Sequence, residues 1–305
     1  MEEILKKEFR CRKVWSCGGQ CQGGGISSGS VFSLDGQKVF VKRNPAPGSR
    51  ALFDGECASL EILRETKIIR VPKPIKVFSH GDKTAFVMEY LMLSSVRNFA
   101  CLGEKLAKIH LYNKNLKDNA TRNESFIGRA SEYVDRFGFH TTTCCGFIPL
   151  TNEWKDDWLT FYASNRLKPQ IDRAIETYQD RGVLSLWPEI ERVLPKLFPS
   201  DLNITPALLH GDFWEGNVGE VNNEPCMYDP ACSYGHSEYD LGLAHFFRAF
   251  PPEFHDTYHS FIPKKPGFEK RLKVYLLFNA FNNWNHFGSV YQDLCISLMH
   301  EISNF

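Results

Sequence analysis

The stretch Ala207-Leu-Leu-His-Gly-Asp-Phe-Trp-Glu-Gly-Asn217, followed by Cys226-Met-Tyr-Asp229-Pro, decides how this chain is expected to fold. An apolar run leads into His-Gly-Asp, an Asn follows that Asp, and a second apolar run ends in another Asp. Phosphoryl transfer from ATP uses one carboxylate at the acceptor hydroxyl, and an amide and a second carboxylate on Mg²⁺. The pattern predicts Asp212 as the catalytic carboxylate and Asn217 and Asp229 as metal ligands, set between short buried strands.

The same residues have a structural alternative. His-Gly-Asp and Glu-Gly-Asn form turns readily, and Asp-Pro commonly begins a loop, so the Asp-x4-Asn spacing alone is a weak signal. The apolar strand before it and the apolar run that ends in Asp229 favour the catalytic interpretation.

Composition excludes several classes of protein. The 305 residues are 43% hydrophobic and 24% charged, which is typical of a globular protein with one large domain or two lobes. Lys+Arg and Asp+Glu are both 36, and this zero net charge argues against nucleic-acid or membrane-surface partners. No apolar run of about 18 residues is present, and the N-terminus lacks the apolar core of a signal peptide. We therefore expect a cytoplasmic protein whose cysteines are mostly thiols.

A glycine-rich stretch at residues 17–29 precedes strands predicted at 31–34 and 39–42, which Asp35-Gly36 joins as a hairpin. Glycine lets backbone N–H groups approach phosphate oxygens, because no Cβ intervenes. A flexible surface loop is the alternative. The phosphate-binding interpretation assigns nucleotide contacts to Gly23, Gly24, Gly25 and Ser28.

Lys42 closes the second of these strands, after two apolar residues. A lysine in such a place can pair the phosphates of ATP if a carboxylate holds it. Glu56 is the candidate, because it lies between Leu52 and Leu60 on the apolar stripe of a predicted helix. The alternative for Lys42 and Glu56 is a surface ion pair of little energetic value.

Residues 84–91 are predicted to form the last strand of a first lobe. Its end is expected to act as a hinge whose backbone faces an adenine, through Met88, Glu89, Tyr90 and Leu91. A plain central strand explains the same pattern equally well.

Beyond residue 91 the pattern becomes helical, with an irregular polar loop expected at 113–135. Helices are predicted at 155–180, 184–198, 237–250, 268–283 and 292–302. Strands early and helices late predict an α+β fold with lobes at 1–91 and 92–305.

This chain resembles the kinase-like superfamily in the order of its motifs, which are the glycine-rich loop, Lys42, Glu56 and the two acidic motifs. Tryptophan-rich blocks extend the likeness over nearly the whole chain, and within the superfamily they resemble the fructosamine-3-kinase / ketosamine-3-kinase family. These blocks include residues 152–158, 208–214 and 283–288.

The resemblance implies a bilobal protein-kinase-like fold, with a small antiparallel sheet lobe carrying one key helix and a larger helical lobe. It implies ATP and Mg²⁺ as cofactors, and phosphorylation of the 3-hydroxyl of fructosamine or ribulosamine adducts, which initiates deglycation and repair of proteins. It also implies that Asp212 is the base, that Asn217 and Asp229 bind metal, and that Lys42 and Glu56 handle phosphates.

Three aromatic or polar residues are candidates for the sugar pocket. Trp214 lies two residues after the expected base, where its indole could stack on a sugar face. Asn283 and His286 lie in an aromatic helix end and would complete the pocket. Core packing is the alternative for all three.

Many members of the family carry a Cys directly before the loop Ile, whereas Gly25 stands there in this chain and the nearest thiols are Cys17 and Cys21. We expect a monomer, with a redox-dependent dimer as the alternative. Asp240 is given no functional role.

Two other functions fit parts of the pattern. A small-molecule kinase of the aminoglycoside or choline type shares the Asp-x4-Asn motif, although the tryptophan-rich blocks disfavour it. A nucleotide-binding pseudokinase scaffold is disfavoured by the joint presence of Lys42, Glu56, Asp212, Asn217 and Asp229.

Overall fold

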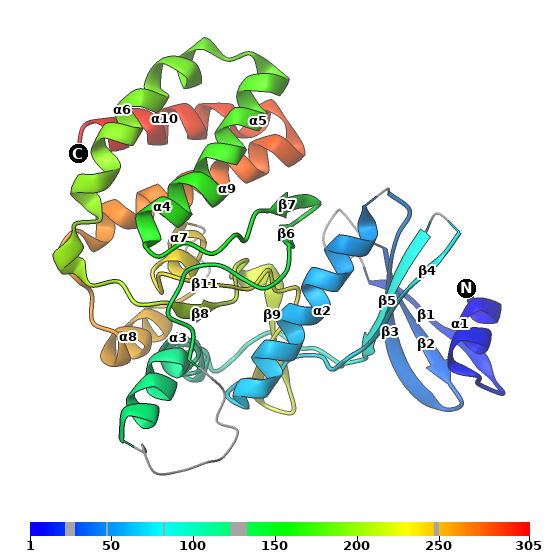
Figure 1. The fold of residues 1–305 in the computed structure, drawn as a ribbon. Coiled ribbons are helices and arrows are strands. Elements are labelled where there is room, and N and C mark those ends of the chain that lie inside the picture. The colour runs from blue at the N-terminus through cyan, green and yellow to red at the C-terminus, as the bar shows by residue number, and fades with distance from the viewer. Residues whose placement is uncertain (22–27, 47, 82, 123–132, 247–249) are drawn as a thin grey trace. The chain divides into compact units, whose positions relative to one another are not determined.

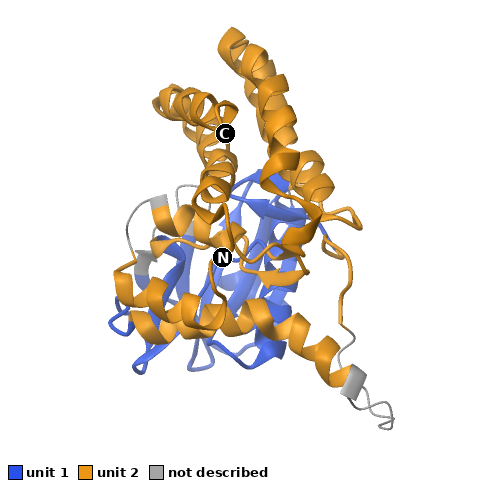
Figure 2. Cartoon of the chain, turned by 90° about the vertical axis from the view of Figure 1, so that its left-hand side faces the viewer, with its two compact units in different colours: residues 1–98, 141–149, 216–231 blue, residues 99–140, 150–215, 232–305 orange. Residues whose placement is uncertain are grey.

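The computed structural model describes the chain except for residues 22–27, 47, 82, 123–132 and 247–249. It divides into two compact units, coloured separately in Figure 2. Unit 1 consists of Met1–Asn98, Thr141–Pro149 and Gly216–Ala231, and unit 2 of Phe99–His140, Leu150–Glu215 and Cys232–Phe305. The first break therefore follows Asn98, and two later segments return to unit 1. The lobe boundaries expected at 91 and 92 stay a prediction.

Unit 1 is built on a five-stranded antiparallel sheet in the order β1-β2-β3-β5-β4 (Figure 1). Asp35 and Gly36 have φ of 48° and 98° and close the predicted hairpin between β2 and β3, because both turn positions need the left-handed region. The strands are β1 (Val14–Cys21), β2 (Ser28–Leu34), β3 (Gln37–Asn44), β4 (Pro74–His80) and β5 (Lys83–Glu89).

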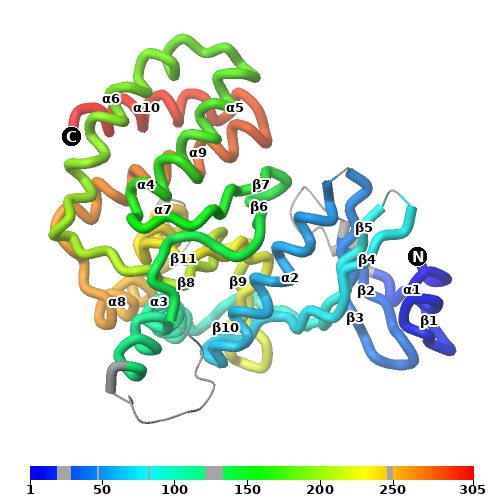
Figure 3. Tube along the Cα trace, viewed as in Figure 1, coloured from blue at the N-terminus to red at the C-terminus, as the bar shows by residue number. Residues whose placement is uncertain are grey.

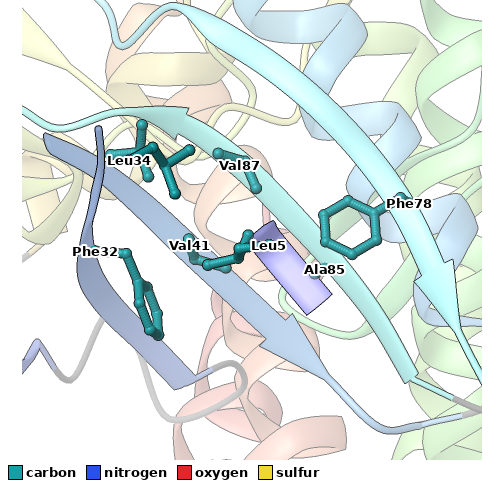
Figure 4. Close-up of a cluster of buried hydrophobic side chains, with 8 residues drawn as sticks. Leu5, Phe32, Leu34, Val41, Phe78, Ala85 and Val87 are labelled. Carbon is teal, nitrogen blue, oxygen red and sulfur yellow. The ribbon is translucent and has the colours of Figure 1, made fainter. Parts of the chain in front are cut away.

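Helices α1 (Glu2–Phe9) and α2 (Ser49–Thr66) pack against this sheet. Leu5 of α1 is fully buried among apolar side chains of the strands (Figure 4). Figure 4 shows it close to Val41 and Ala85, and the cluster is completed by Phe32, Leu34, Val39, Phe78 and Val87. Because side chains alternate along a strand, Val41 faces this cluster and Lys42 faces the opposite way.

A second hairpin belongs to the same unit, formed by β9 (Val218–Val221) and β10 (Glu224–Met227). Asn222 and Asn223 have φ of 53° and 66°, so this too is a tight two-residue turn. Figure 3 shows the trace that leaves β5 passing beside β9. Ser94 pairs there with Glu220 through reciprocal backbone hydrogen bonds of 3.0 and 2.8 Å. A short strand β6 (Thr143–Cys145), which pairs with β7 (Ile148–Leu150), lies against α2.

Unit 2 is mainly helical, and with the sheet of unit 1 it confirms the predicted α+β class. Its only paired strands among the described residues are β8 (Ala207–Leu209) and β11 (Ser233–Gly235). Its longer helices are α3 (Phe99–Arg122), α4 (Trp158–Tyr162), α5 (Lys168–Tyr178), α6 (Arg181–Leu197), α7 (Tyr239–Phe246), α8 (Pro252–Phe261), α9 (Phe268–Phe287) and α10 (Gln292–Ser303).

Three details differ from expectation. The irregular loop predicted from residue 113 is wrong up to Arg122, where α3 ends. A turn of π-helix at Ala163–Leu167 joins α4 to α5, and α8 was not predicted. Asn113 is one polar residue that made this part of α3 resemble a loop. Its side-chain amide donates to the carbonyls of Val134 and Pro206, at 2.7 and 2.8 Å, and so has partners outside its own helix. No helix in the described part of the chain is long and apolar enough to span a bilayer.

Leu5→Ala should destabilise unit 1 substantially, because a fully buried leucine that leaves a cavity costs about 2–5 kcal/mol. Leu184→Ala is the matched control, since Leu184 lies on α6 with 59% of its surface exposed. Urea unfolding of both variants measures the difference. Equal losses in the two variants would contradict the proposed role of α1 in the core.

Candidate active site

The expected site residues are distributed over both units. In unit 1 the Nζ of Lys42 lies 2.7 Å from Oε1 of Glu56 and 2.5 Å from Oδ1 of Asp229. The side chains of Lys42 and Glu56 are 10% and 9% exposed, and that of Asp229 is 30% exposed. The structure thus brings together three of the residues that the sequence singled out.

Local sequence explains how Glu56 reaches Lys42. Glu56 follows Phe53 by one helical turn on α2, and Phe53 lies with Phe86 of β5 at a ring separation of 6.0 Å. Phe86 is the partner of Lys42 in the β3–β5 ladder. A Cβ on Gly55 would come 2.3 Å from the carbonyl oxygen of Thr142, so a glycine is required for α2 to approach this segment so closely.

The charges of this triad are coupled. Burial alone would lower the pKa of Lys42, but the attraction of Asp229 and Glu56 outweighs it and raises the pKa above its usual value. Burial raises the pKa of Glu56, the charge of Asp229 adds to that rise, and Lys42 opposes it. Lys42 therefore remains an ammonium, the form that pairs with phosphate oxygens.

Asn217 and Asp229 lie at the same end of the β9–β10 hairpin. Asn217 directly precedes β9 and is buried, and its backbone oxygen accepts a hydrogen bond of 3.0 Å from the N–H of Tyr228. Asp229 follows with a positive φ of 55°. An amide oxygen and a carboxylate fit Mg²⁺, which usually takes one or two carboxylates and completes its shell with phosphates and water. Their role as metal ligands stays a prediction.

The expected nucleotide contacts are only partly described. Gly23, Gly24 and Gly25 lie outside the described residues, and Ser28 is described only in its backbone, opposite Arg43. Cys17 is exposed on β1, and the side chain of Cys21 is also outside the description. A redox role for either thiol stays a prediction.

The expected hinge is anchored at its first half. Met88 is buried, and the N–H of Glu89 donates to the carbonyl of Lys73 at 2.8 Å. The carboxylate of Glu89 accepts from Arg70 and from the N–H of Lys73. The Glu89 amide is therefore already used, while adenine contacts by Tyr90 and Leu91 stay a prediction.

In unit 2 the loop that carries Asp212 is held by Asp240 of α7. The Asp240 carboxylate accepts hydrogen bonds from the N–H groups of His210 and Gly211, at 2.7 and 2.9 Å. Nε2 of His110 lies 3.1 Å from the same carboxylate, and its Nδ1 lies 2.7 Å from the hydroxyl of Tyr258. Gly211 has φ of 85°, which only glycine adopts readily.

Sequence reasoning missed Asp240, although one signal was available. This acid lies between Tyr239 and Leu241, which are both buried, and an acidic residue in a buried stretch needs hydrogen-bond donors. Two backbone amides of the His-Gly-Asp loop are those donors. His110 has its partners Tyr258 and Asp240 in the same network.

The three candidate sugar residues all belong to unit 2. Trp214 is half-buried after the His-Gly-Asp loop, and Asn283 and His286 are half-buried near the end of α9. Burial lowers the pKa of His286, while the Asn282 carbonyl, 2.7 Å from Nδ1, opposes that shift. A neutral His286 that donates from Nδ1 has Nε2 as an acceptor, which suits a sugar hydroxyl. Their contact with a sugar stays a prediction.

Comparisons with known proteins agree with the order of motifs. The family model for fructosamine kinase matches residues 3–304. Ketosamine-3-kinase from Mus musculus is 44% identical over 99% of this chain and all of its own length. The chloroplastic protein-ribulosamine 3-kinase from Arabidopsis thaliana is 35% identical, covering 97% of this chain and 84% of its own. A crystal structure of a Haemophilus somnus protein, assigned as a fructosamine-3-kinase, superposes with a TM-score of 0.79 at 24% identity, covering 99% and 96% of the two chains. The predicted protein-kinase-like fold is confirmed.

Asp240→Asn should lower kcat by about a hundredfold, a loss comparable to that from removing one preorganised hydrogen-bond donor in an active site. An amide in place of the carboxylate turns an NH₂ toward one of the two loop amides, so the loop loses its anchor. Steady-state kinetics measure the change. Asp156→Asn is the control, because Asp156 is an exposed partner of Arg136. A kcat within twofold of wild type would refute the anchoring role.

Proposed function

The chain belongs to the fructosamine kinase family, and on that basis we propose that it transfers the γ-phosphoryl group of ATP to the 3-hydroxyl of ketosamines. The observation that carries the proposal is the buried contact of Lys42 with Glu56 and Asp229 in unit 1. An ammonium beside a carboxylate is what nucleotide phosphates and their metal need, and this supports the proposal in a chain matched to the family from end to end.

In this mechanism Asp212 accepts the proton of the sugar hydroxyl as the oxygen attacks the γ-phosphorus in line. Lys42 pairs with phosphate oxygens, and Glu56 keeps it directed away from solvent. Asn217 and Asp229 would hold Mg²⁺, which would neutralise charge on the phosphates. Asp240 keeps the His210–Gly211 backbone fixed, so that Asp212 needs little reorganisation during the reaction.

The relatives suggest the substrate class. One is named for ketosamines and another for protein-bound ribulosamines. We propose that this chain acts on fructosamine or ribulosamine adducts, free or on lysines of glycated proteins. Phosphorylation makes the C3 oxygen a better leaving group. After enolisation between C1 and C2 the phosphate is eliminated from C3, and hydrolysis of the resulting C1 imine releases the free amine and a dicarbonyl sugar. The reaction is therefore the first step of protein deglycation.

The rival functions, the location of the enzyme and its oligomeric state are the remaining parts of the proposal. The family match favours a ketosamine over the acceptors of aminoglycoside or choline kinases, and the retained acidic and basic residues favour an active enzyme over a pseudokinase scaffold. We place the enzyme in the cytoplasm, as a monomer without nucleic-acid or membrane partners. A thiol-dependent dimer is the alternative oligomeric state.

Wild-type protein should consume ATP with ribulose-lysine or fructose-lysine, and Asp212→Asn should lower turnover by about a thousandfold or more while its affinity for ATP stays within twofold of wild type. Loss of a general base and of its orienting effect accounts for this magnitude.

Coupled ADP release with the two substrates side by side measures turnover, and calorimetry measures ATP binding. Consumption of ATP with neither ketosamine would overturn the substrate assignment. Normal turnover by Asp212→Asn would overturn the role of the base.

Trp214→Ala should raise the KM for the sugar by up to about tenfold, the value expected when an aromatic contact of about 0.5–1.5 kcal/mol is lost. The KM for ATP should remain unchanged. Trp15→Ala is the control, because Trp15 is a partly exposed residue of β1. If Trp214 is only a packing residue, both KM values will stay constant while thermal stability falls.

A further inference from the structure

A buried acid in unit 1 joins the segment after the hinge to the hairpin that carries Asn217 and Asp229. The side chain of Glu220 on β9 is 2% exposed. Its Oε2 accepts from the N–H of Arg97 at 3.0 Å, and its Oε1 accepts from the guanidinium of Arg97 at 2.8 and 3.1 Å. These hydrogen bonds, the backbone N–H of Arg97 first, lower the pKa of Glu220, so it is held as a carboxylate.

Backbone contacts reinforce this junction. Glu220 exchanges two backbone hydrogen bonds with Ser94, so residue 94 pairs along the outer edge of β9. A Cβ on Gly219 would lie 3.2 Å from the side chain of Leu93, which shows how closely the segment after the hinge approaches this strand. Nη2 of Arg97 also donates to Asn223 in the hairpin turn, at 2.7 Å.

The other edge of the hairpin is tied to the start of the hinge. Arg70 forms a parallel bridge with Cys226 of β10, and its carbonyl accepts from the N–H of Met227 at 3.0 Å. The guanidinium of Arg70 pairs with the carboxylate of Glu89, the last residue of β5. Both ends of the hinge segment are therefore linked to the two strands that lead to Asn217 and Asp229.

We propose that Glu220 is a positioning residue that keeps the hinge segment in register with the β9–β10 hairpin, and so couples adenine binding to metal binding. This inference rests on the proposed function, because it requires a nucleotide at the hinge and Mg²⁺ at the hairpin. When the hinge segment and the hairpin are held in register, the nucleotide gains binding free energy from its adenine contacts and from its phosphate and metal contacts together. If the register is loosened, the contacts of the phosphates and metal no longer add fully to those of the adenine.

The test is the gain in ADP affinity that Mg²⁺ produces, measured by calorimetry without any sugar. Glu220→Gln and Arg97→Ala should each reduce that gain by about five- to tenfold, a modest allosteric coupling. Binding of adenosine, which lacks phosphates, should stay at the wild-type value. Arg97 is 71% exposed, so its variant keeps the test valid even if Glu220→Gln does not fold.

Arg50→Ala is the matched control, because it removes an exposed Arg–Asp pair from α2 in the same unit. It should keep the full effect of Mg²⁺. An unchanged gain in both test variants would overturn the inference, as would an equal loss of adenosine and ADP affinity, which is what a purely structural role predicts. Failure of wild-type protein to bind ADP more tightly with Mg²⁺ would overturn the proposed metal site, and the inference with it.

Discussion

The contact of Lys42 with Glu56 and Asp229 is the constraint on which the rest of unit 1 depends. A lysine at this depth is stable only with charged partners, and removal of one partner from a buried ion pair costs about 3–5 kcal/mol. The fold must therefore bring Lys42 of the sheet, Glu56 of α2 and Asp229 after the β9–β10 hairpin into contact. The Lys42 ammonium is shared between two carboxyl groups, and Asp229 is the more exposed of the two.

In both units a buried carboxylate accepts hydrogen bonds from backbone N–H groups. Asp240 accepts hydrogen bonds from the amides of the His210–Gly211 loop, and Glu220 accepts one from the amide of Arg97 and pairs with Ser94. Neither residue needs to touch a substrate to matter, because a loop or hairpin that carries a reactive group must keep its geometry within fractions of an ångström. The chemistry that we propose therefore depends on these anchors as well as on Asp212.

The pairing of Lys42 with Glu56 was predictable from sequence, because each residue stands in a local pattern: Lys42 ends an apolar strand, and Glu56 lies on an apolar helical stripe. The α+β class followed from the order of strands and helices. Asp240 and Glu220 were not predicted, since their partners lie 30 and 123 positions away along the chain. The helical continuation through Asn113 was missed for the same reason, as its polar side chain is satisfied by Val134 and Pro206.

We propose that Asn217 and Asp229 hold the metal of a nucleotide whose γ-phosphate is presented to Asp212. Anomalous diffraction from crystals grown with Mn²⁺ and a non-hydrolysable ATP analogue measures this directly. The account predicts a manganese peak at about 2 Å from the Asn217 amide oxygen and the Asp229 carboxylate, with Lys42 on the phosphates and Asp212 turned toward the γ-phosphate. A metal bound elsewhere, or an Asp212 carboxylate directed away from the nucleotide, would contradict it.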